Sequence, residues 1–185
     1  MNLLEIIAAL LSLLAVWLAV KPYLANWPAA MLGTALYLYL FWENRLYSDM
    51  VLQLVFLVMQ GYGWAKWTKG NTEKPLNIGR MLPSQLLISG IFTLVAWVGW
   101  TLLLLKIKPD ASMPWLDSFT AALSVLAICM QAWKKIENWL VWMLADLIYI
   151  PLYLKAEMPV TALLYAIFLL IAFLGWRRWK SLCAG

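Results

Sequence analysis

The sequence contains no histidine and only two cysteines, Cys129 and Cys183. Without histidine the chain lacks the commonest general base and metal ligand. Two widely separated cysteines cannot build a disulfide framework or a zinc site. A glycine-rich phosphate loop and a nucleophile–base pair are also missing. These absences argue against an enzyme, and they predict no catalytic residue, no bound metal and no cofactor.

Charged residues are scarce as well. They make up 12% of the 185 residues, whereas hydrophobic residues make up 65%. Soluble domains average about 25% charged and about 45–50% apolar residues. The composition therefore predicts a polytopic membrane protein with little chain left for a soluble domain. The net charge of +5 does not indicate a nucleic-acid partner, because the basic residues fall in short connections where membrane orientation explains them.

Apolar runs of membrane-spanning length predict an all-α polytopic membrane protein with seven transmembrane helices. The first run starts without a basic n-region or a clear cleavage site, which indicates a retained helix and not a signal peptide. The predicted spans cover residues 3–20, 23–42, 47–67, 84–105, 115–133, 138–154 and 159–176.

Lysine and arginine predict the orientation of these spans. Ten of the fourteen fall on the side that also holds the C-terminus, and four fall on the other side. By the positive-inside rule, the N-terminus is outside and the C-terminus is cytoplasmic. The ten are Lys21, Lys66, Lys69, Lys74, Arg80, Lys134, Lys135, Arg177, Arg178 and Lys180; the four are Arg45, Lys106, Lys108 and Lys155.

The chain aligns with itself at an offset of 112 positions, the difference between Asn26 and Asn138. Without a gap, this offset matches two Asn-Trp pairs and two Gly-Trp-x-x-Trp stretches, which begin at Gly63 and Gly175. Spans 1–3 therefore match spans 5–7 as a 3+1+3 parallel repeat about an axis along the membrane normal. The predicted parts are 1–68 for the first repeat, 69–112 for a cytoplasmic loop and linker helix, and 113–185 for the second repeat with a short basic tail.

Repeats of this kind are typical of carriers whose halves move around a site near the bilayer midplane. A substrate without two-fold symmetry should make the halves differ where it touches them. The offset pairs Asp146 with Thr34, Trp142 with Ala30, and Tyr165 with Gln53.

The sixth predicted span carries the strongest candidate site. Asp146 lies near its middle, where a carboxylate costs several kcal/mol unless something offsets it. Trp139, Trp142, Tyr149 and Tyr153 follow at helical spacings on the same face. An acid among aromatic rings suits a flat organic cation. The alternatives are a structural carboxylate for Asp146 and interfacial or lipid-facing positions for the two tryptophans.

Polar residues complete the candidate set. Gln53 and Gln60 share one face of the third span and either bind substrate or hydrogen-bond to other helices. Asn138 opens the sixth span, where it is the expected N-cap. The predicted substrate-binding residues are Gln53, Gln60, Asn138, Trp139, Trp142, Asp146 and Tyr149.

These motifs resemble the Pnu-type vitamin transporters. The resemblance rests on Leu46-Tyr47 with Leu52-Gln53, Tyr62-Gly63-Trp64 with Trp67, Glu137-Asn138-Trp139-x-x-Trp142, Gly175 and Trp179. It implies a SWEET-like fold, a homotrimer and a place in the bacterial inner membrane. It also implies facilitated diffusion of a vitamin precursor without ATP or an ion gradient, and trapping of that precursor by a cytoplasmic kinase.

The same resemblance implies nicotinamide riboside as the substrate and a ligand contact for Gln53. Riboside carriers often have asparagine at the positions of Asp146 and Leu174, so a thiamine carrier of the family is an alternative. Both vitamins carry a fixed positive charge on an aromatic ring. A sugar facilitator of SWEET type and a membrane receptor or assembly subunit are further alternatives.

Overall fold

The computed structural model describes residues 3–43, 47–70, 77–107, 113–155 and 159–183. Arg45, Lys74 and Lys108 of the charge pattern lie outside these residues, and so does the side chain of Tyr153. The described chain is helical throughout, apart from short turns and one isolated β-bridge. The helices are α1 (Leu3–Val20), α2 (Asn26–Glu43), α3 (Tyr47–Gly70), α4 (Pro83–Ile107), α5 (Pro114–Ala132), α6 (Glu137–Lys155) and α7 (Pro159–Cys183).

Each predicted span corresponds to one helix. The largest difference is in α7, which continues through the basic residues after 176 to Cys183. By length and composition, four helices of the described part of the chain are long and apolar enough to cross a membrane: α1, α4, α5 and the Ala162–Cys183 part of α7. The other three contain many of the tryptophan, tyrosine and amide side chains, which lower their hydropathy without shortening them.

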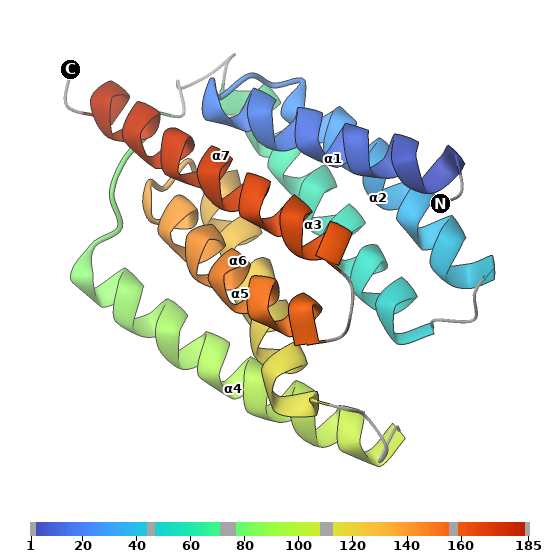
Figure 1. Ribbon diagram of the computed structural model, residues 1–185. Helices are drawn as coiled ribbons and strands as arrows, with labels where there is room; N and C mark the ends of the chain where they lie inside the picture. The colour runs from blue at the N-terminus through green and yellow to red at the C-terminus, as the bar shows by residue number, and fades with distance from the viewer. Residues whose placement is uncertain (1–2, 44–46, 71–76, 108–112, 156–158, 184–185) are drawn as a thin grey trace.

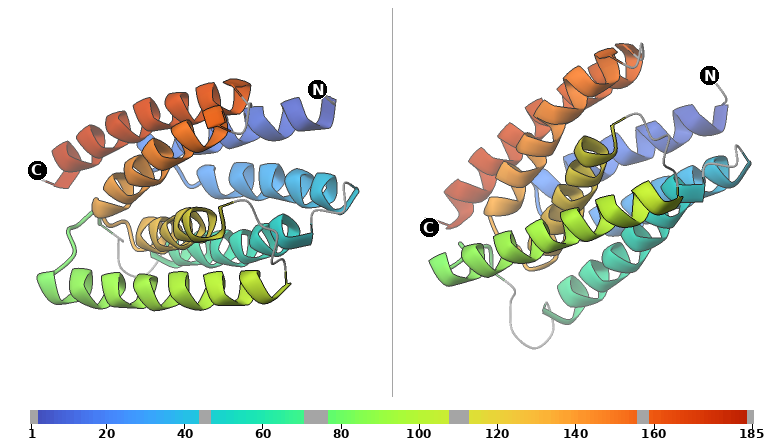
Figure 2. Two further views of the ribbon diagram at one scale, coloured as in Figure 1. Left: turned by 60° about the horizontal axis from the view of Figure 1, so that its bottom comes forward. Right: turned by 90° about the horizontal axis from the view of Figure 1, so that it is seen from below.

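Six of the helices form a closed ring in the order α1, α2, α3, α5, α6, α7 and back to α1. Each packs against its two neighbours in this order, whereas α2 and α6 face each other without packing together in the described part. The left view of Figure 2 shows α5–α7 beside α1–α3, with α4 beneath them. Among the described helices α4 packs only against α5, so it lies outside the ring.

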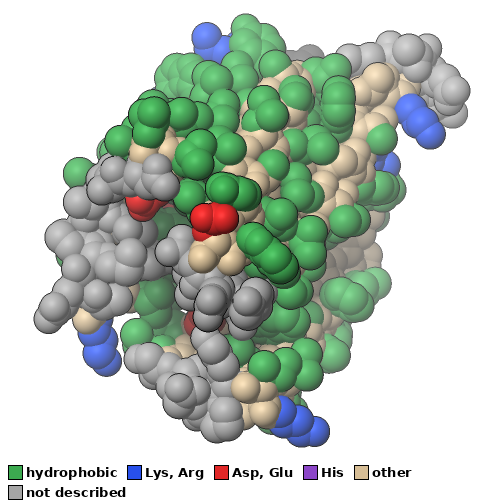
Figure 3. Space-filling view, turned by 90° about the vertical axis from the view of Figure 1, so that its right-hand side faces the viewer, with side chains coloured by type: hydrophobic (Ala, Val, Ile, Leu, Met, Phe, Trp, Pro, Cys, Tyr) green, Lys and Arg blue, Asp and Glu red, His purple; other side chains and the backbone are tan. Residues whose placement is uncertain are grey.

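Each helix of the ring has an exposed side that faces the bilayer and a buried side that faces the ring interior. On α6, Leu140, Leu144 and Leu147 are exposed, whereas Asp146 on the opposite side is buried. On the face shown in Figure 3, hydrophobic side chains cover most of the described surface, and lysine and arginine lie at its periphery. This is the pattern that a bilayer imposes on a helical bundle.

One end of the ring is filled by the tryptophan cluster, which consists of Trp27, Trp67, Trp139 and Trp179. All four are at most 2% exposed. Trp27 meets Trp67 edge to face at 5.3 Å between ring centroids, and Trp139 meets Trp179 in the same way at 5.5 Å. Trp67 and Trp179 join the two pairs at 6.3 Å. Such tilted and edge-to-face contacts add to the free energy gained from burial.

The cluster also ties the two sides of the ring together. The indole N–H of Trp67 donates to the carbonyl of Ala132 at 3.1 Å, and that of Trp179 donates to the carbonyl of Ala19 at 3.0 Å. These bonds link α3 to the end of α5 and α7 to the end of α1. Figure 1 shows this end on the left, where α7 ends and the chain passes from α3 to α4.

Two glycines make room for the cluster. A Cβ atom at Gly63 would overlap the ring of Trp27, and one at Gly175 would lie 2.6 Å from the ring atoms of Trp139. Real Cβ atoms do not approach other atoms so closely, so both positions require glycine unless the indoles move.

The turn before α6 corrects one prediction. Asn138 is not the N-cap, because α6 begins at Glu137 and Asn138 Oδ1 accepts no hydrogen bond from the described residues. Its Nδ2 instead donates to the carbonyl of Lys135, just as Asn26 Nδ2 donates to the carbonyl of Tyr23 at 2.6 Å. Each carbonyl also accepts the backbone N–H of the same asparagine, so the side-chain amide adds a second hydrogen bond to a turn carbonyl.

Candidate functional site

The inward faces of α3 and α7 divide the ring into three levels. Gln53, Gln60 and Trp67 follow each other at intervals of seven on α3, which is about two turns or 10 Å. Tyr165, Ala172 and Trp179 are spaced in the same way on α7. Trp67 and Trp179 belong to the tryptophan cluster, so Gln60 and Ala172 lie one level above it and Gln53 and Tyr165 one level further.

At the middle level, a side-chain hydrogen bond joins α2 and α3. Gln60 Nε2 donates to the hydroxyl of Thr34 at 2.9 Å, and both side chains are buried. Gln60 Oε1 accepts no hydrogen bond in the described part of the chain. An interhelical amide–hydroxyl bond of this kind contributes on the order of 0.6 kcal/mol in a membrane protein.

At the corresponding level, the described residues of α6 and α7 form no hydrogen bond like that between Gln60 and Thr34. Asp146, the counterpart of Thr34, is 4% exposed, and the counterpart of Gln60 is Ala172, which is 1% exposed. The described residues give the Asp146 carboxylate neither a hydrogen bond nor an ion pair. A carboxylate shielded from water without a partner is costly, so it favours a ligand that brings a positive charge or hydrogen-bond donors.

Aromatic residues lie on both sides of Asp146 along the inward side of α6. Tyr149 stacks on Tyr165 of α7 with 4.5 Å between ring centroids and 34° between planes. Trp142, one turn before Asp146, is partly buried and packs against the buried core that includes the tryptophan cluster. The inward side of α6 therefore offers π-faces next to a negative charge, and both attract a cationic ring.

The structure brings together only part of the predicted set. Trp142, Asp146 and Tyr149 share the inward side of α6, and Gln60 lies at the matching level of α3. Gln53 lies two turns from Gln60 on α3, and its side chain is partly exposed. Trp139 instead lies in the tryptophan cluster.

Asn138 lies in the first turn of α6, where its Nδ2 donates to the carbonyl of Lys135 in the preceding turn. The indole N–H of Trp139 finds no acceptor among the described residues.

Sequence reasoning did not include Thr34 and Tyr165 in the candidate set. Thr34 holds the amide of Gln60, and Tyr165 stacks on Tyr149. The signal was present, because the repeat offset pairs Thr34 with Asp146 and Tyr165 with Gln53. Those pairs were noted as places where the halves differ, and their contacts with the candidate residues could be seen only in three dimensions.

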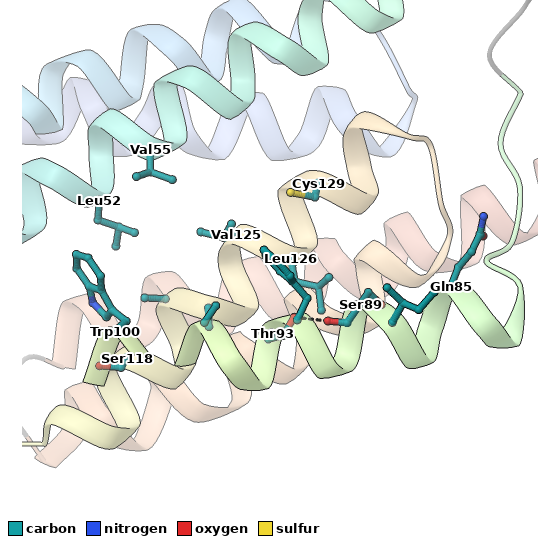
Figure 4. Close-up of a pocket in the computed structure, with 15 residues that line it drawn as sticks. Leu52, Val55, Gln85, Ser89, Thr93, Trp100, Ser118, Val125, Leu126 and Cys129 are labelled. Atoms are coloured by element: carbon teal, nitrogen blue, oxygen red, sulfur yellow. Dashed lines mark hydrogen bonds between the residues drawn. The ribbon is translucent and has the colours of Figure 1, made fainter. Parts of the chain in front are cut away.

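The structure also contains a cavity of about 560 Å³, which lies outside the ring between α3, α4 and α5. Figure 4 shows its wall, from Gln85 and Cys129 at one end to Trp100 and Ser118 at the other. None of the seven predicted substrate-binding residues lines it. The cavity is therefore separate from the candidate substrate site.

Comparison with known proteins places the chain among vitamin transporters. Residues 2–181 match the family model described as nicotinamide mononucleotide transporter. The nicotinamide riboside transporter PnuC of Escherichia coli is 23% identical, over 95% of this chain and 84% of that protein. PnuC of Haemophilus influenzae is 28% identical, over 97% and 80%. The riboflavin/roseoflavin transporter RibM of Streptomyces davaonensis is 25% identical, over 95% and 83%.

A solved structure shares the fold. The crystal structure of the vitamin B3 transporter PnuC superposes with a TM-score of 0.75 at 24% identity, covering 98% of this chain and 82% of the other. These findings give no support to the sugar-facilitator alternative, and the relatives are transporters, not enzymes or receptors. Because the family model covers almost the whole chain, the protein belongs to the nicotinamide mononucleotide transporter family and is a multi-pass transporter of the bacterial inner membrane.

Proposed function

We propose that this protein carries nicotinamide riboside across the inner membrane by facilitated diffusion. The observation that supports a flat cationic substrate most directly is the buried Asp146, which has no hydrogen bond or ion pair among the described residues, and similarity to riboside transporters favours the riboside among such cations. The nicotinamide ring of the riboside is a flat cation, and it would offset the charge that the chain leaves without a partner.

Each candidate residue has a role in this proposal. Trp142 and Tyr149 stack on the ring, Asp146 offsets its charge, and Gln53 binds the ribose hydroxyls or the carboxamide. The free acceptor Gln60 Oε1 could take a ligand donor at the same level. Trp139 and Asn138 stay in the candidate set, and both would act from the end of the site nearest the tryptophan cluster.

The proposed architecture is a SWEET-like 3+1+3 repeat with α4 as linker. Its support is a series of contacts that recur at the offset of 112. The pairs are Trp27–Trp67 with Trp139–Trp179, and the amide bonds of Asn26 and Asn138. The packing of α3 on α5 likewise recurs as α7 on α1. The basic ends of the helices support a cytoplasmic C-terminus and an outside N-terminus.

Alternating access would then require the tryptophan cluster to open. On the proposed orientation the cluster faces the cytoplasm, and it is closed in this structure by the bonds from Trp67 to Ala132 and from Trp179 to Ala19. Release of substrate to the cytoplasm would break both bonds and separate the two central indoles. The predicted spans contain only one acidic residue far from their ends, Asp146, which favours movement down the substrate gradient over proton coupling. A cytoplasmic kinase that phosphorylates the substrate would keep that gradient inward.

Thiamine is the alternative substrate that also carries a fixed positive charge. Riboflavin is the cargo in the name of one relative, but its ring system has no fixed positive charge to offset Asp146. The resemblance to Pnu-type transporters supports a homotrimer as the assembled form. Cross-linking in native membranes would test that assembly independently of the substrate.

The substrate is tested by titrating the purified protein with nicotinamide riboside, thiamine and riboflavin. We expect the riboside to bind most tightly. Asp146→Asn should weaken its binding by about thirtyfold or more, because close opposite charges at a binding interface are coupled by about 2 kcal/mol or more. The control is Glu5→Gln, which removes an exposed acid at the start of α1.

Unchanged riboside affinity in Asp146→Asn would remove this acid from the site. Tighter binding of thiamine or riboflavin by the wild-type protein would replace the proposed substrate. Uptake of labelled riboside into liposomes that contain only the purified protein tests facilitated diffusion separately, because neither ATP nor an ion gradient is supplied. Failure of uptake in that system would contradict the proposed mechanism even if the riboside binds.

A further inference from the structure

The cavity between α3, α4 and α5 is an elongated apolar groove that opens toward the bilayer. Leu52 and Val55 of α3 face Ile88, Phe92 and Ala96 of α4, and α5 forms the floor. The cavity extends along α4 from Gln85 to Trp100, a length of about 22 Å at the helical rise. No packing contact joins α3 and α4 among the described residues, so the groove between them has no protein cover.

The hydroxyl groups of the groove are mostly satisfied by backbone. Ser89 donates to the carbonyl of Leu86, and Thr93 donates to that of Ser89. Ser118, at the end opposite Gln85, is buried without a partner in the described part. An apolar groove at bilayer depth does not hold water, so it must be filled by hydrocarbon or by other apolar side chains.

Three basic residues, Lys66, Arg80 and Lys135, form a basic cluster at the end of the groove that holds Gln85 and Cys129. Lys66 Nζ lies 3.2 Å from the ring centroid of Trp133, one turn beyond Cys129. Lys135 Nζ donates to the carbonyl of Arg80 at 3.1 Å, just before α4 begins.

Backbone contacts hold the cluster in place at the start of α4. Gly79 N donates to the carbonyl of Lys134, and Ile136 N donates to the carbonyl of Gly79. Glu137 also lies in this region, and its carboxylate accepts from the backbone N–H of Met81. None of the three cluster residues forms an ion pair with another described residue, so no described acid neutralises their positive charge.

We propose that an anionic phospholipid binds at this position, with one acyl chain in the groove and its phosphate against the basic cluster. Each buried methylene contributes to binding, and basic pockets between membrane helices attract anionic headgroups. A second copy of this chain fits less well. On the proposed orientation the cytoplasmic side of this chain is basic, so a copy in the groove would fill the apolar space without supplying an anion for the basic cluster.

The test is native mass spectrometry of the purified full-length protein from mixed micelles with phosphatidylglycerol or phosphatidylcholine. We expect retention of phosphatidylglycerol and little phosphatidylcholine. Ala96→Phe should abolish this retention by filling the groove, whereas Ala35→Phe, on the exposed face of α2, should leave it unchanged. Lys66→Gln or Lys135→Gln should weaken retention about fivefold each, whereas Lys106→Gln at the other end of α4 should not.

Equal retention of the two lipids would overturn the proposal, and so would full retention by Ala96→Phe. Both outcomes are read on protein whose fold is verified by gel filtration and circular dichroism. A bifunctional maleimide reports on the second-copy alternative in the Cys183→Ser background, where Cys129 in the groove wall is the remaining thiol. Cross-linked dimers through Cys129 would place a neighbouring protein, and not a lipid, on the groove. None of these measurements depends on the identity of the transported substrate.

Discussion

The two sides of the ring are most alike at the tryptophan cluster and least alike one level above it. At the cluster, Trp27–Trp67 and Trp139–Trp179 meet at nearly the same distance and angle. Above it, α2 and α3 present a bonded Thr34–Gln60 pair, whereas α6 and α7 present Asp146 and Ala172.

The contrast between these two levels distinguishes residues that pack the ring from residues that recognise a ligand. Closing the end of a ring needs only size and complementary shape, so each side can use the same arrangement of two indoles. Recognition of a ligand without two-fold symmetry needs unequal chemistry on the two sides. A polar pair that is satisfied internally costs little to bury, whereas a lone carboxylate is tolerated only where something else supplies its partner.

Giving α7 the glutamine that α3 has at the matching position should have the largest effect on substrate affinity. In Ala172→Gln the new amide could donate to Asp146 as Gln60 does to Thr34, and substrate would have to displace it. Hydrogen bonds to charged groups contribute about 2 kcal/mol, so substrate affinity should fall about thirtyfold. Isothermal titration with the transported vitamin measures the change.

Ala172→Met is the matched control, because it adds similar bulk without a donor. An equal loss in both variants would show that size, and not hydrogen bonding, is responsible. Gln60→Ala should lower affinity less than Ala172→Gln, since it leaves the carboxylate available.

The two glycines at the tryptophan cluster should instead respond alike. Gly63→Ala and Gly175→Ala each force a Cβ against a locked indole, which should destabilise the protein by about 1.5 kcal/mol. Thermal unfolding in detergent, followed by tryptophan fluorescence, measures the effect. The control is Gly90→Ala on α4, where a Cβ meets nothing within 4 Å. A large shift at one position and none at the other would show that the cluster is not equivalent on its two sides.

The smallest effect is expected at Trp142, which has Ala30 as its counterpart on α2. Trp142→Ala should weaken vitamin binding by about 1 kcal/mol, or about fivefold, if the indole stacks on a cationic ring. Trp142→Phe keeps an aromatic face and should recover part of this loss. Affinity that stays at the wild-type value in Trp142→Ala would assign this tryptophan to packing alone.

Most of the fold could be predicted from the sequence because the bilayer leaves few choices. Seven apolar runs gave seven helices, and bounds such as Leu3–Val20 agree with the helix that forms. The inward face of α6 was predictable too, since helical spacing places Trp142, Asp146 and Tyr149 together. The N-cap prediction for Asn138 failed because its amide can satisfy either backbone N–H groups or carbonyls, and sequence alone does not show which need a partner.

The sequence by itself determined the spans, the offset between matching residues and the presence of one acid deep in a helix, because these follow from hydropathy and periodicity along the chain. Only the tertiary structure decided which residues meet. It placed Trp139 in a sealed cluster, bonded Gln60 to Thr34, and buried Asp146 without a hydrogen bond or ion pair to another described residue. Those contacts join helices far apart in sequence, so the way the ring closes, and not local pattern, determines whether a buried polar group has a partner.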